Sequence, residues 1–132
     1  GEIGSIEEVD KIKQLKPLKA VYGNIDNHVI RNEFPLDYRF SCEDVKVWIT
    51  HIGGYPNRYS KRVSENLKYE KVDLFICGHS HILKVINDKK HNLLHINPGA
   101  IGKHGFHNKR TMVRFEIDGK KIENLEIIEF NR

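Results

Sequence analysis

Two histidines separated by one residue, His79 and His81, form the pattern with the clearest chemical meaning in this sequence. They lie in the segment Gly-His-Ser-His at residues 78–81, directly after an apolar run at residues 74–77. The run predicts a buried strand, and the glycine predicts a tight turn at its end. Neutral imidazole is the commonest metal ligand, and two rings that leave one strand end can face a single ion. Taken alone, the pattern leaves metal binding and hydrogen bonding within a loop equally open.

Three more apolar runs of the sequence end in polar groups or in a turn. These endings are Gly-Asn-Ile-Asp at residues 23–26, Thr-His at residues 50–51 and Asn-Pro-Gly at residues 97–99. Open α/β sheets place their ligands beyond the carboxyl ends of the strands. Four strand ends of this kind therefore predict one common site.

Periodicity and turn residues predict the elements that position these groups. Ser5 and Glu8 form a capping box that begins a helix, and Pro17 ends it. Strands are predicted at residues 18–22, 38–40, 45–49, 74–77, 83–86, 93–96, 111–117 and 122–130, and a second helix at residues 58–69. Asp118-Gly119 predicts a type I′ turn between the last two strands. The pattern is that of an α/β domain with an antiparallel flank.

The order of the motifs, GN-x-D, TH, GHSH and NPG, resembles the calcineurin-like metallophosphoesterases, in particular their small bacterial and archaeal phosphodiesterase branch. The resemblance extends from residue 1 to about residue 130. Its most specific part is GHSH after a buried strand, followed by NPG. The resemblance implies an α/β fold in which two mixed sheets pack face to face with helices outside, and a metal-dependent phosphodiesterase activity.

The resemblance also implies two divalent metal sites. By position, one metal takes Glu2, Asn24, His51 and His79, with Glu2 at the place of the family's bridging aspartate. The other metal shares that carboxylate and takes His81. Together, two such metals neutralise the charge of a phosphate ester and activate water for in-line attack. The structural alternatives are turn or loop roles for Asn24 and the histidines, and a first-turn acid that favours the helix dipole for Glu2.

Other candidate residues lie around these ligands. Mixed imidazole, amide and carboxylate ligands suit manganese, iron, nickel or zinc better than calcium, and the resemblance favours manganese. Asp26 is a candidate for orienting a metal ligand, with a simple turn role as the alternative. Five basic or imidazole side chains occupy residues 103–110, where Lys103 and His104 are candidates for receiving a phosphate and a solvated loop is the alternative.

The sequence departs from the family at its beginning. Members open with a strand that carries D-x-H, a helix and a second strand, whereas this sequence begins with Gly-Glu-Ile-Gly-Ser. The expectation is a fold that lacks its first βαβ unit, a second metal site that is half missing, and impaired turnover. Ile25 also occupies the position at which many members have a proton-donating histidine, although the small phosphodiesterase branch lacks that histidine as well. His28, His104 and His107 are candidates for the role, with ordinary surface histidines as the alternative.

Three interpretations follow. The first is an enzyme that hydrolyses a small phosphodiester. The second is a catalytically inactive binding module, because one branch of the family, the retromer subunit, keeps the fold as a protein scaffold. The third is an unproductive fragment, in which an unpaired sheet edge favours aggregation or homo-oligomers.

Composition limits the class of protein. The chain of 132 residues is long enough for one domain, expected at residues 1–132, with its own core. Apolar residues make up 39% and charged residues 30%, which is typical of a soluble globular chain. No apolar run reaches the ~20 residues of a membrane span, and the net charge of +4 does not indicate nucleic acid. Cys42 and Cys77 form no C-x-x-C motif, which favours a reducing cytoplasm.

Overall fold

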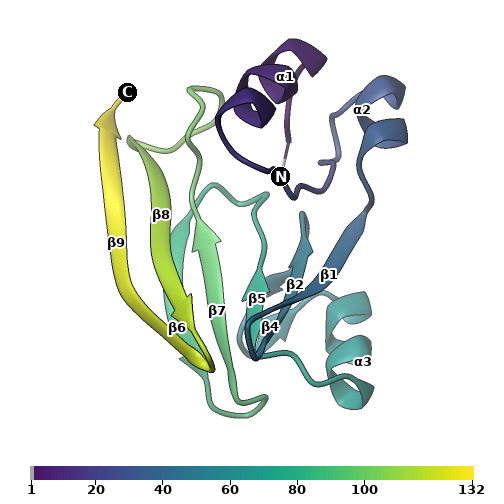
Figure 1. Ribbon diagram of the computed structural model, residues 1–132, viewed down its shortest axis with the longest axis vertical. Coiled ribbons are helices and arrows are strands. Elements are labelled where there is room, and N and C mark those ends of the chain that lie inside the picture. Colours follow the sequence, from purple (N-terminus) through teal and green to yellow (C-terminus); the bar gives the residue numbers. More distant parts are fainter. Residues whose placement is uncertain (1) are drawn as a thin grey trace.

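The computed structural model of the chain describes residues 2–132; Gly1, where the family resemblance begins, lies outside the described residues. Its elements form a five-stranded sheet, a two-stranded ribbon of β8 and β9, a short hairpin of β3 and β4, and three helices (Figure 1). In chain order they are α1 (Ile6–Leu15), α2 (His28–Glu33), β1 (Asp37–Cys42), β2 (Val45–Thr50), β3 (Gly54–Tyr55), β4 (Arg58–Tyr59), α3 (Lys61–Tyr69), β5 (Leu74–Ile76), β6 (Leu83–Asp88), β7 (Leu93–Pro98), β8 (Lys109–Asp118) and β9 (Lys121–Asn131).

The five-stranded sheet has the strand order β1-β2-β5-β7-β6. Its three central strands, β2, β5 and β7, run parallel, and their register places Ile49, Ile76 and Ile96 side by side. The edge strands β1 and β6 are antiparallel to their neighbours. Because β2, β5 and β7 share one direction, the residues that follow them meet at the same edge of the sheet.

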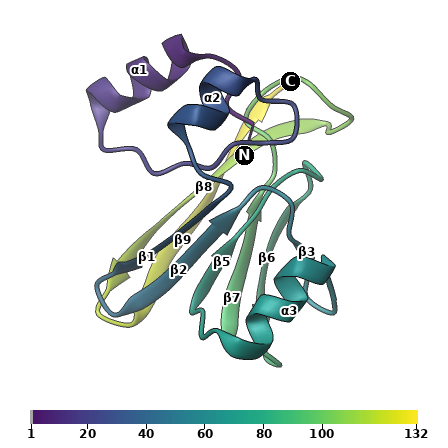
Figure 2. The ribbon, with the colours of Figure 1, turned by 90° about the vertical axis from the view of Figure 1, so that its right-hand side faces the viewer.

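The two faces of this sheet are covered by different elements, as Figure 2 shows for α3 and the ribbon of β8 and β9. Side chains alternate along β5: Leu74 packs in the cluster that includes ribbon residues such as Phe115, while Phe75 packs with Val63 and Leu67 of α3. This alternation is the period of two that a strand imposes. The mixed α/β architecture, with sheet and ribbon face to face and helices outside, confirms the fold class expected from the sequence.

Helices α1 and α2 pack on each other beyond the carboxyl ends of the parallel strands (Figure 1). Their small core is centred on Val9, Ile30 and Phe34. The capping role of Ser5 is confirmed, since its Oγ accepts a hydrogen bond from the Glu8 N–H at 3.3 Å. Among residues 2–132 no helix is long and apolar enough to cross a membrane.

Four local predictions differ from the structure. The helix predicted at residues 58–69 begins only at Lys61, because Arg58 and Tyr59 form β4 and Ser60 is the N-cap. Residues 18–22 belong to neither sheet, so the strand predicted there is wrong; their apolar side chains pack into the α1–α2 core instead. Helix α2 has no counterpart among the predicted elements; Asn27 is its N-cap, and its Oδ1 accepts a hydrogen bond from the Ile30 N–H. The last hairpin forms as predicted, but its loop is Gly119-Lys120 with positive φ at Gly119, the pattern of a type II′ turn.

The buried ring of His95, at the centre of the sheet in β7, should make the stability of the fold depend on pH. The side chain is fully buried against the rings of Tyr55, Tyr59 and Phe75, and within the described part of the chain neither ring nitrogen has a hydrogen-bond partner. Burial lowers its pKa from 6.5 to about 4. Between these values the unfolded chain binds a proton that the folded chain does not. The free energy of unfolding should therefore fall as the pH decreases, by about 2 kcal/mol at pH 5.

The substitution His95→Phe tests this dependence. A phenyl ring fills the same space and does not titrate, so the variant should keep about 2 kcal/mol of stability that the unchanged chain loses between pH 7 and pH 5. Urea unfolding at both pH values gives the difference, with His28→Phe on the exposed start of α2 as the control. Equal losses in the His95→Phe variant and the unchanged chain would contradict the assignment.

Candidate metal centre

The carboxyl ends of β2 and β5 bring two of the expected histidines together. His51 is the first residue after β2, and its carbonyl oxygen accepts a hydrogen bond from the Gly78 N–H at 2.8 Å. This bond ties the end of β2 to the turn that carries His79. The His51 side chain is buried, and its ring meets that of His79 edge to face, with 5.1 Å between the centroids.

Asn24 and Glu2 complete a cluster around these rings. The Oδ1 atom of Asn24 lies 2.9 Å from Nε2 of His51 and 3.1 Å from Nδ1 of His79. Oε1 of Glu2 lies 3.3 Å from the same Nε2. One ligand atom each from Glu2, His51 and His79 lie within 4.8 Å of one another. The four residues expected for one metal therefore converge, although they come from four distant parts of the chain.

The atoms of this cluster fit a divalent cation. The carboxylate of Glu2 and the amide oxygen of Asn24 only accept hydrogen bonds. Burial lowers the pKa of His51 to about 4, so at neutral pH its ring is uncharged and offers a nitrogen lone pair. Two oxygens and two imidazole nitrogens that face one another are the ligand set that manganese, iron, nickel or zinc prefers.

The turn that carries His79 and His81 has an unusual backbone. Both histidines have left-handed φ angles, +71° for His79 and +62° for His81. For residues other than glycine such angles cost about 1–3 kcal/mol each and persist only where the surroundings fix them. Asn97 supplies such a constraint: its buried amide donates to the Gly78 carbonyl and to Ser80 Oγ, both at 3.1 Å. The sequence marked NPG as a turn near the site but gave Asn97 no function.

Asp26 holds the segment that carries Glu2. Its carboxylate accepts hydrogen bonds from the N–H groups of Ile3 and Gly4 at 3.0 Å and from that of Gly23 at 2.8 Å. Burial by itself raises the pKa of Asp26, but these backbone bonds outweigh it and hold the pKa below its usual value. The carboxylate therefore joins the residues directly after Glu2 to the turn directly before Asn24. Gly23 permits the close approach, because a β-carbon there would collide with the Glu2 side chain.

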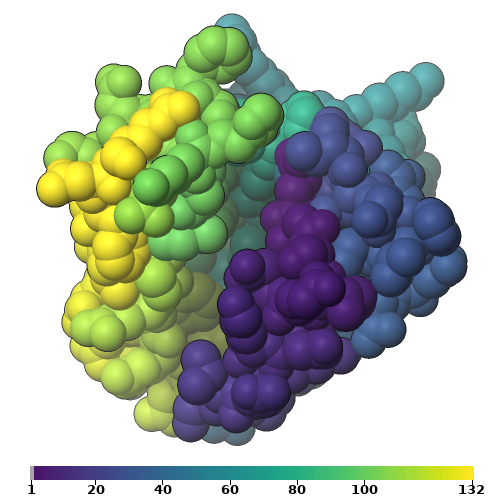
Figure 3. Space-filling model, turned by 90° about the horizontal axis from the view of Figure 1, so that it is seen from above, coloured from purple at the N-terminus to yellow at the C-terminus, as the bar shows by residue number. Residues whose placement is uncertain are grey.

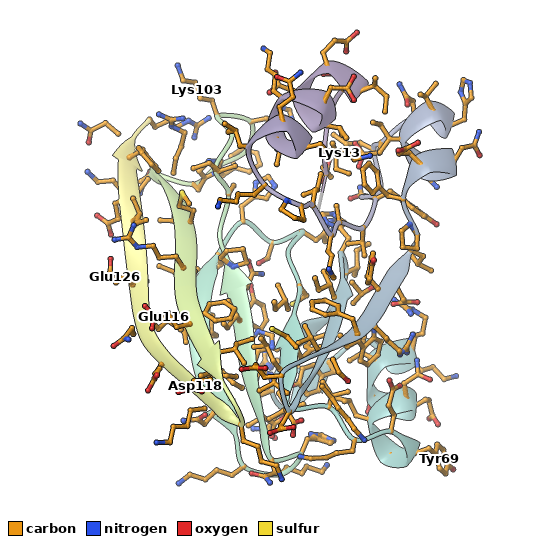
Figure 4. The ribbon with its side chains drawn as sticks, viewed as in Figure 1. Lys13, Tyr69, Lys103, Glu116, Asp118 and Glu126 are labelled. Atoms are coloured by element: carbon orange, nitrogen blue, oxygen red, sulfur yellow. The ribbon has the colours of Figure 1, made fainter. Side chains whose placement is uncertain are left out.

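The other candidates lie around the cluster and outside it. A cavity of about 770 Å³ includes Glu2, His51 and His79 in its wall, and Lys103 and His104 line it as well. Figure 3 shows this end of the molecule hollowed between the N-terminal segment and the loop that follows β7, and Figure 4 shows Lys103 projecting from that loop. His81 lines the cavity but is not in the ligand cluster. Its ring packs against that of His107, with 5.2 Å between the ring centroids.

A larger hollow of about 1040 Å³ lies at the opposite end of the sheet, where β2, β5 and β7 begin. Its wall alternates lysine with acidic side chains, as in Lys46, Lys71 and Asp73, and includes no histidine. Neighbouring opposite charges neutralise one another, and Nζ of Lys71 lies 3.6 Å from Oδ1 of Asp73. Among the described residues, this hollow therefore offers no imidazole ligand, unlike the cavity at the carboxyl edge.

Comparison with known families agrees with this geometry. The model of the calcineurin-like phosphoesterase superfamily domain matches residues 1–120. The chain belongs to this superfamily. The match covers every motif from GN-x-D to NPG, and it confirms the family inferred from them. Among curated proteins, no relative matches this chain significantly.

Solved structures share the fold of this calcineurin-like phosphoesterase. An archaeal phosphodiesterase superposes with a TM-score of 0.70 at 22% identity, over 96% of this chain and 77% of that one. Vps29 from Entamoeba histolytica in complex with Zn²⁺ gives 0.71 at 16% identity, over 98% and 78%. A Thermotoga maritima protein gives 0.69 at 20% identity, over 96% and 74%. At these identities the similarity establishes the fold and not the activity.

Proposed function

We propose that this chain is a divalent-metal-dependent phosphodiesterase that hydrolyses a small phosphodiester. The observation that carries the proposal is the convergence of Glu2, Asn24, His51 and His79 at the carboxyl edge of the sheet. Membership of a phosphoesterase superfamily and the fold of an archaeal phosphodiesterase support it. We assign manganese as the metal, and residues 1–132 as one metallophosphoesterase domain.

The metal and the residues of the cluster have different roles in the proposed reaction. When bound, the metal polarises the phosphoryl oxygen and lowers the pKa of water. The rings of His51 and His79 give nitrogen lone pairs, and the oxygens of Glu2 and Asn24 offset the cation's charge. Asp26 holds the Glu2 segment in place through its backbone bonds.

The experiment that tests the proposal is hydrolysis of bis(p-nitrophenyl) phosphate by the purified chain. We expect p-nitrophenol release that requires added Mn²⁺ and stops with a chelator, because the facing ligand atoms need the cation to bind an anionic substrate. Parallel assays with Fe²⁺, Ni²⁺ and Zn²⁺ identify the preferred metal. Absence of turnover with all four metals, in a chain shown to bind them, would contradict the proposal.

Lys103 and His104 form the substrate-binding part of the proposal. Both line the cavity beside the ligand cluster, and Lys103 is exposed. Replacing both by alanine should raise the Michaelis constant for bis(p-nitrophenyl) phosphate about tenfold, which is the loss of one charge-assisted contact of about 1.4 kcal/mol. The melting temperature should not change. The control is Lys89→Ala, which removes the same charge at the opposite end of the sheet; an unchanged Michaelis constant in the double variant would leave these residues as ordinary surface.

A second candidate function is a protein-binding module of the same fold, and the rim of the site favours it. Three apolar side chains around the cluster are exposed: Ile25 at 68%, Ile82 at 59% and Phe106 at 102%. Exposed apolar groups that gather in one place are typical of surfaces that contact a partner. Metal binding without hydrolysis of any phosphodiester would favour this function over the first.

We further propose a cytoplasmic location. Cys42 and Cys77 are both free thiols, and burial raises the pKa of Cys77 to about 12, so this thiol stays protonated and inert. Self-association through an edge strand of the sheet, β1 or β6, is part of the same proposal, and light scattering of the purified chain tests it.

A further inference from the structure

The turn that carries His79 and His81 is tied to the rest of the fold through Ser80, the residue between them. Ser80 Oγ accepts a hydrogen bond from the Ile82 N–H at 3.2 Å, within the turn, and one from the side-chain amide of Asn97 on β7 at 3.1 Å. Its third partner is the hydroxyl of Tyr55 on β3. One oxygen atom therefore joins the turn to two other elements of the fold.

The hydrogen-bonding capacity of Ser80 shows the direction of its bond to Tyr55. A serine hydroxyl has one proton to donate and two lone pairs that accept. The N–H groups of Ile82 and Asn97 occupy both lone pairs, so the Ser80 hydroxyl donates its proton to the Tyr55 oxygen. Tyr55 is thus the acceptor that fixes the orientation of the Ser80 hydroxyl. Phenylalanine at position 55 would leave this proton without a partner in the described part of the chain.

Tyr55 can serve as a fixed anchor because its own surroundings hold it. The hairpin of β3 and β4 is closed by the Ser60 N–H, which donates to the Gly53 carbonyl at 2.9 Å. The ring of Tyr55 packs against the buried ring of His95, with 5.6 Å between the centroids, and Nζ of Lys84 lies 5.3 Å from the centroid of the tyrosine ring. The phenol is therefore in place before it meets Ser80, and the contact costs little conformational entropy.

His79 is the metal-ligand candidate that depends most on this tie. Its side chain is exposed, so packing constrains it less than it constrains the buried His51. Its left-handed φ of +71° is strained for a residue other than glycine and persists only where the surroundings fix the backbone. The distance of 3.1 Å between Nδ1 of His79 and Oδ1 of Asn24 therefore requires the turn to keep its shape.

We propose that Tyr55 is a positioning residue of the metal centre, which acts through Ser80 to hold His79 in the ligand cluster. The inference rests on the metal cluster of the proposed function, although its test does not require hydrolysis. Residues that orient a ligand without touching the metal change the metal affinity 10–100-fold when they are lost. Among the described residues, Ser80 lines a cavity at the cluster and Tyr55 does not. Loss of the Tyr55 hydroxyl should therefore act on metal binding and not through a contact with the substrate.

The test is calorimetric titration of the metal-free chain and its variants with Mn²⁺. Tyr55→Phe removes only the hydroxyl and should weaken Mn²⁺ binding about tenfold, whereas Ser80→Thr keeps a hydroxyl and should bind as the parent does. Ser80→Ala should weaken binding at least as much as Tyr55→Phe. The double variant should bind no more weakly than Ser80→Ala alone, because Tyr55 acts through Ser80.

The matched control is Tyr59→Phe, which removes a hydroxyl from the same hairpin. The Tyr59 hydroxyl donates to Asp88 at 2.8 Å, at the opposite end of the sheet. Its loss should lower the melting temperature and leave the Mn²⁺ affinity unchanged. This control separates a general weakening of the hairpin from a specific effect on the turn.

The outcomes separate the role of Tyr55 from the proposed function. Parental affinity in Tyr55→Phe, an equal loss in Tyr59→Phe, or additive losses in the double variant each overturn the inference, whatever the hydrolysis assay shows. A loss in Tyr55→Phe and Ser80→Ala that does not grow in the double variant supports it. If a chain with that result hydrolyses no phosphodiester, the proposed function fails while the role of Tyr55 stands. A parent chain that binds no Mn²⁺ overturns both.

Discussion

Replacing His51 by alanine is expected to lower hydrolysis of bis(p-nitrophenyl) phosphate about a thousandfold, or about 4 kcal/mol of transition-state stabilisation. His51 is the central residue of the cluster, since its Nε2 faces both Asn24 Oδ1 at 2.9 Å and Glu2 Oε1 at 3.3 Å. Its ring is also buried, whereas the His79 side chain is exposed. Kinetics at saturating Mn²⁺ and elemental analysis of bound metal give the two readouts.

The control for this experiment is His28→Ala, which removes an exposed histidine from the start of α2. It should leave both activity and metal content unchanged. The metal-free His51→Ala chain should still fold, as circular dichroism can show, although it loses the Nε2 contacts to Asn24 and Glu2. Full activity with a full complement of metal in His51→Ala would show that the cluster is not the metal centre.

Elements with strong local signals were predictable from the sequence. The apolar run of β5 and the alternation in β8 placed these strands within a few residues, and the Ser5 capping box placed the start of α1. Residues 18–22 were misjudged because an apolar run shows only that side chains are buried. Whether such a run becomes a strand depends on a neighbouring backbone, and here the apolar side chains are buried by α1 and α2 instead.

The site residues that belong to a sequence motif were predictable. Contacts between residues that only the tertiary structure brings together were not. His51 and His79 each follow a parallel strand, so their approach follows from the order of the strands. Asn24 follows an apolar run that forms no strand, and only the family pattern predicts its place beside them. The contact between His81 and His107 has no such signal. It depends on the path of the loop between β7 and β8, in which the left-handed φ of Gly105, +127°, lets the chain fold back.

Asp26 belongs to both groups, because a sequence motif identified the residue but its effect depends on the tertiary structure. Replacing it by alanine should lower the free energy of unfolding by about 2–4 kcal/mol at pH 7, since three backbone N–H groups lose their acceptor. These are the groups of Ile3, Gly4 and Gly23. The same change frees the segment that carries Glu2. The metal proposed for the Glu2, His51 and His79 cluster should therefore bind about 10–100-fold more weakly, as when a group that orients a ligand is lost.

Two comparisons make this prediction specific. Asp10→Ala removes an exposed carboxylate from α1, the neighbouring helix, and should change neither stability nor metal affinity. The pKa of Asp26 is held below 3.8, so its stabilising effect is complete above that pH and is lost as the pH falls through the folded-state value. The stability difference between the parent and Asp26→Ala should therefore be constant from pH 7 to pH 5 and shrink in stronger acid. Urea unfolding at each pH measures the stability difference, and calorimetry with Mn²⁺ measures the affinity. A variant that is destabilised but binds the metal as tightly as the parent would show that Asp26 supports the turn alone and does not position Glu2.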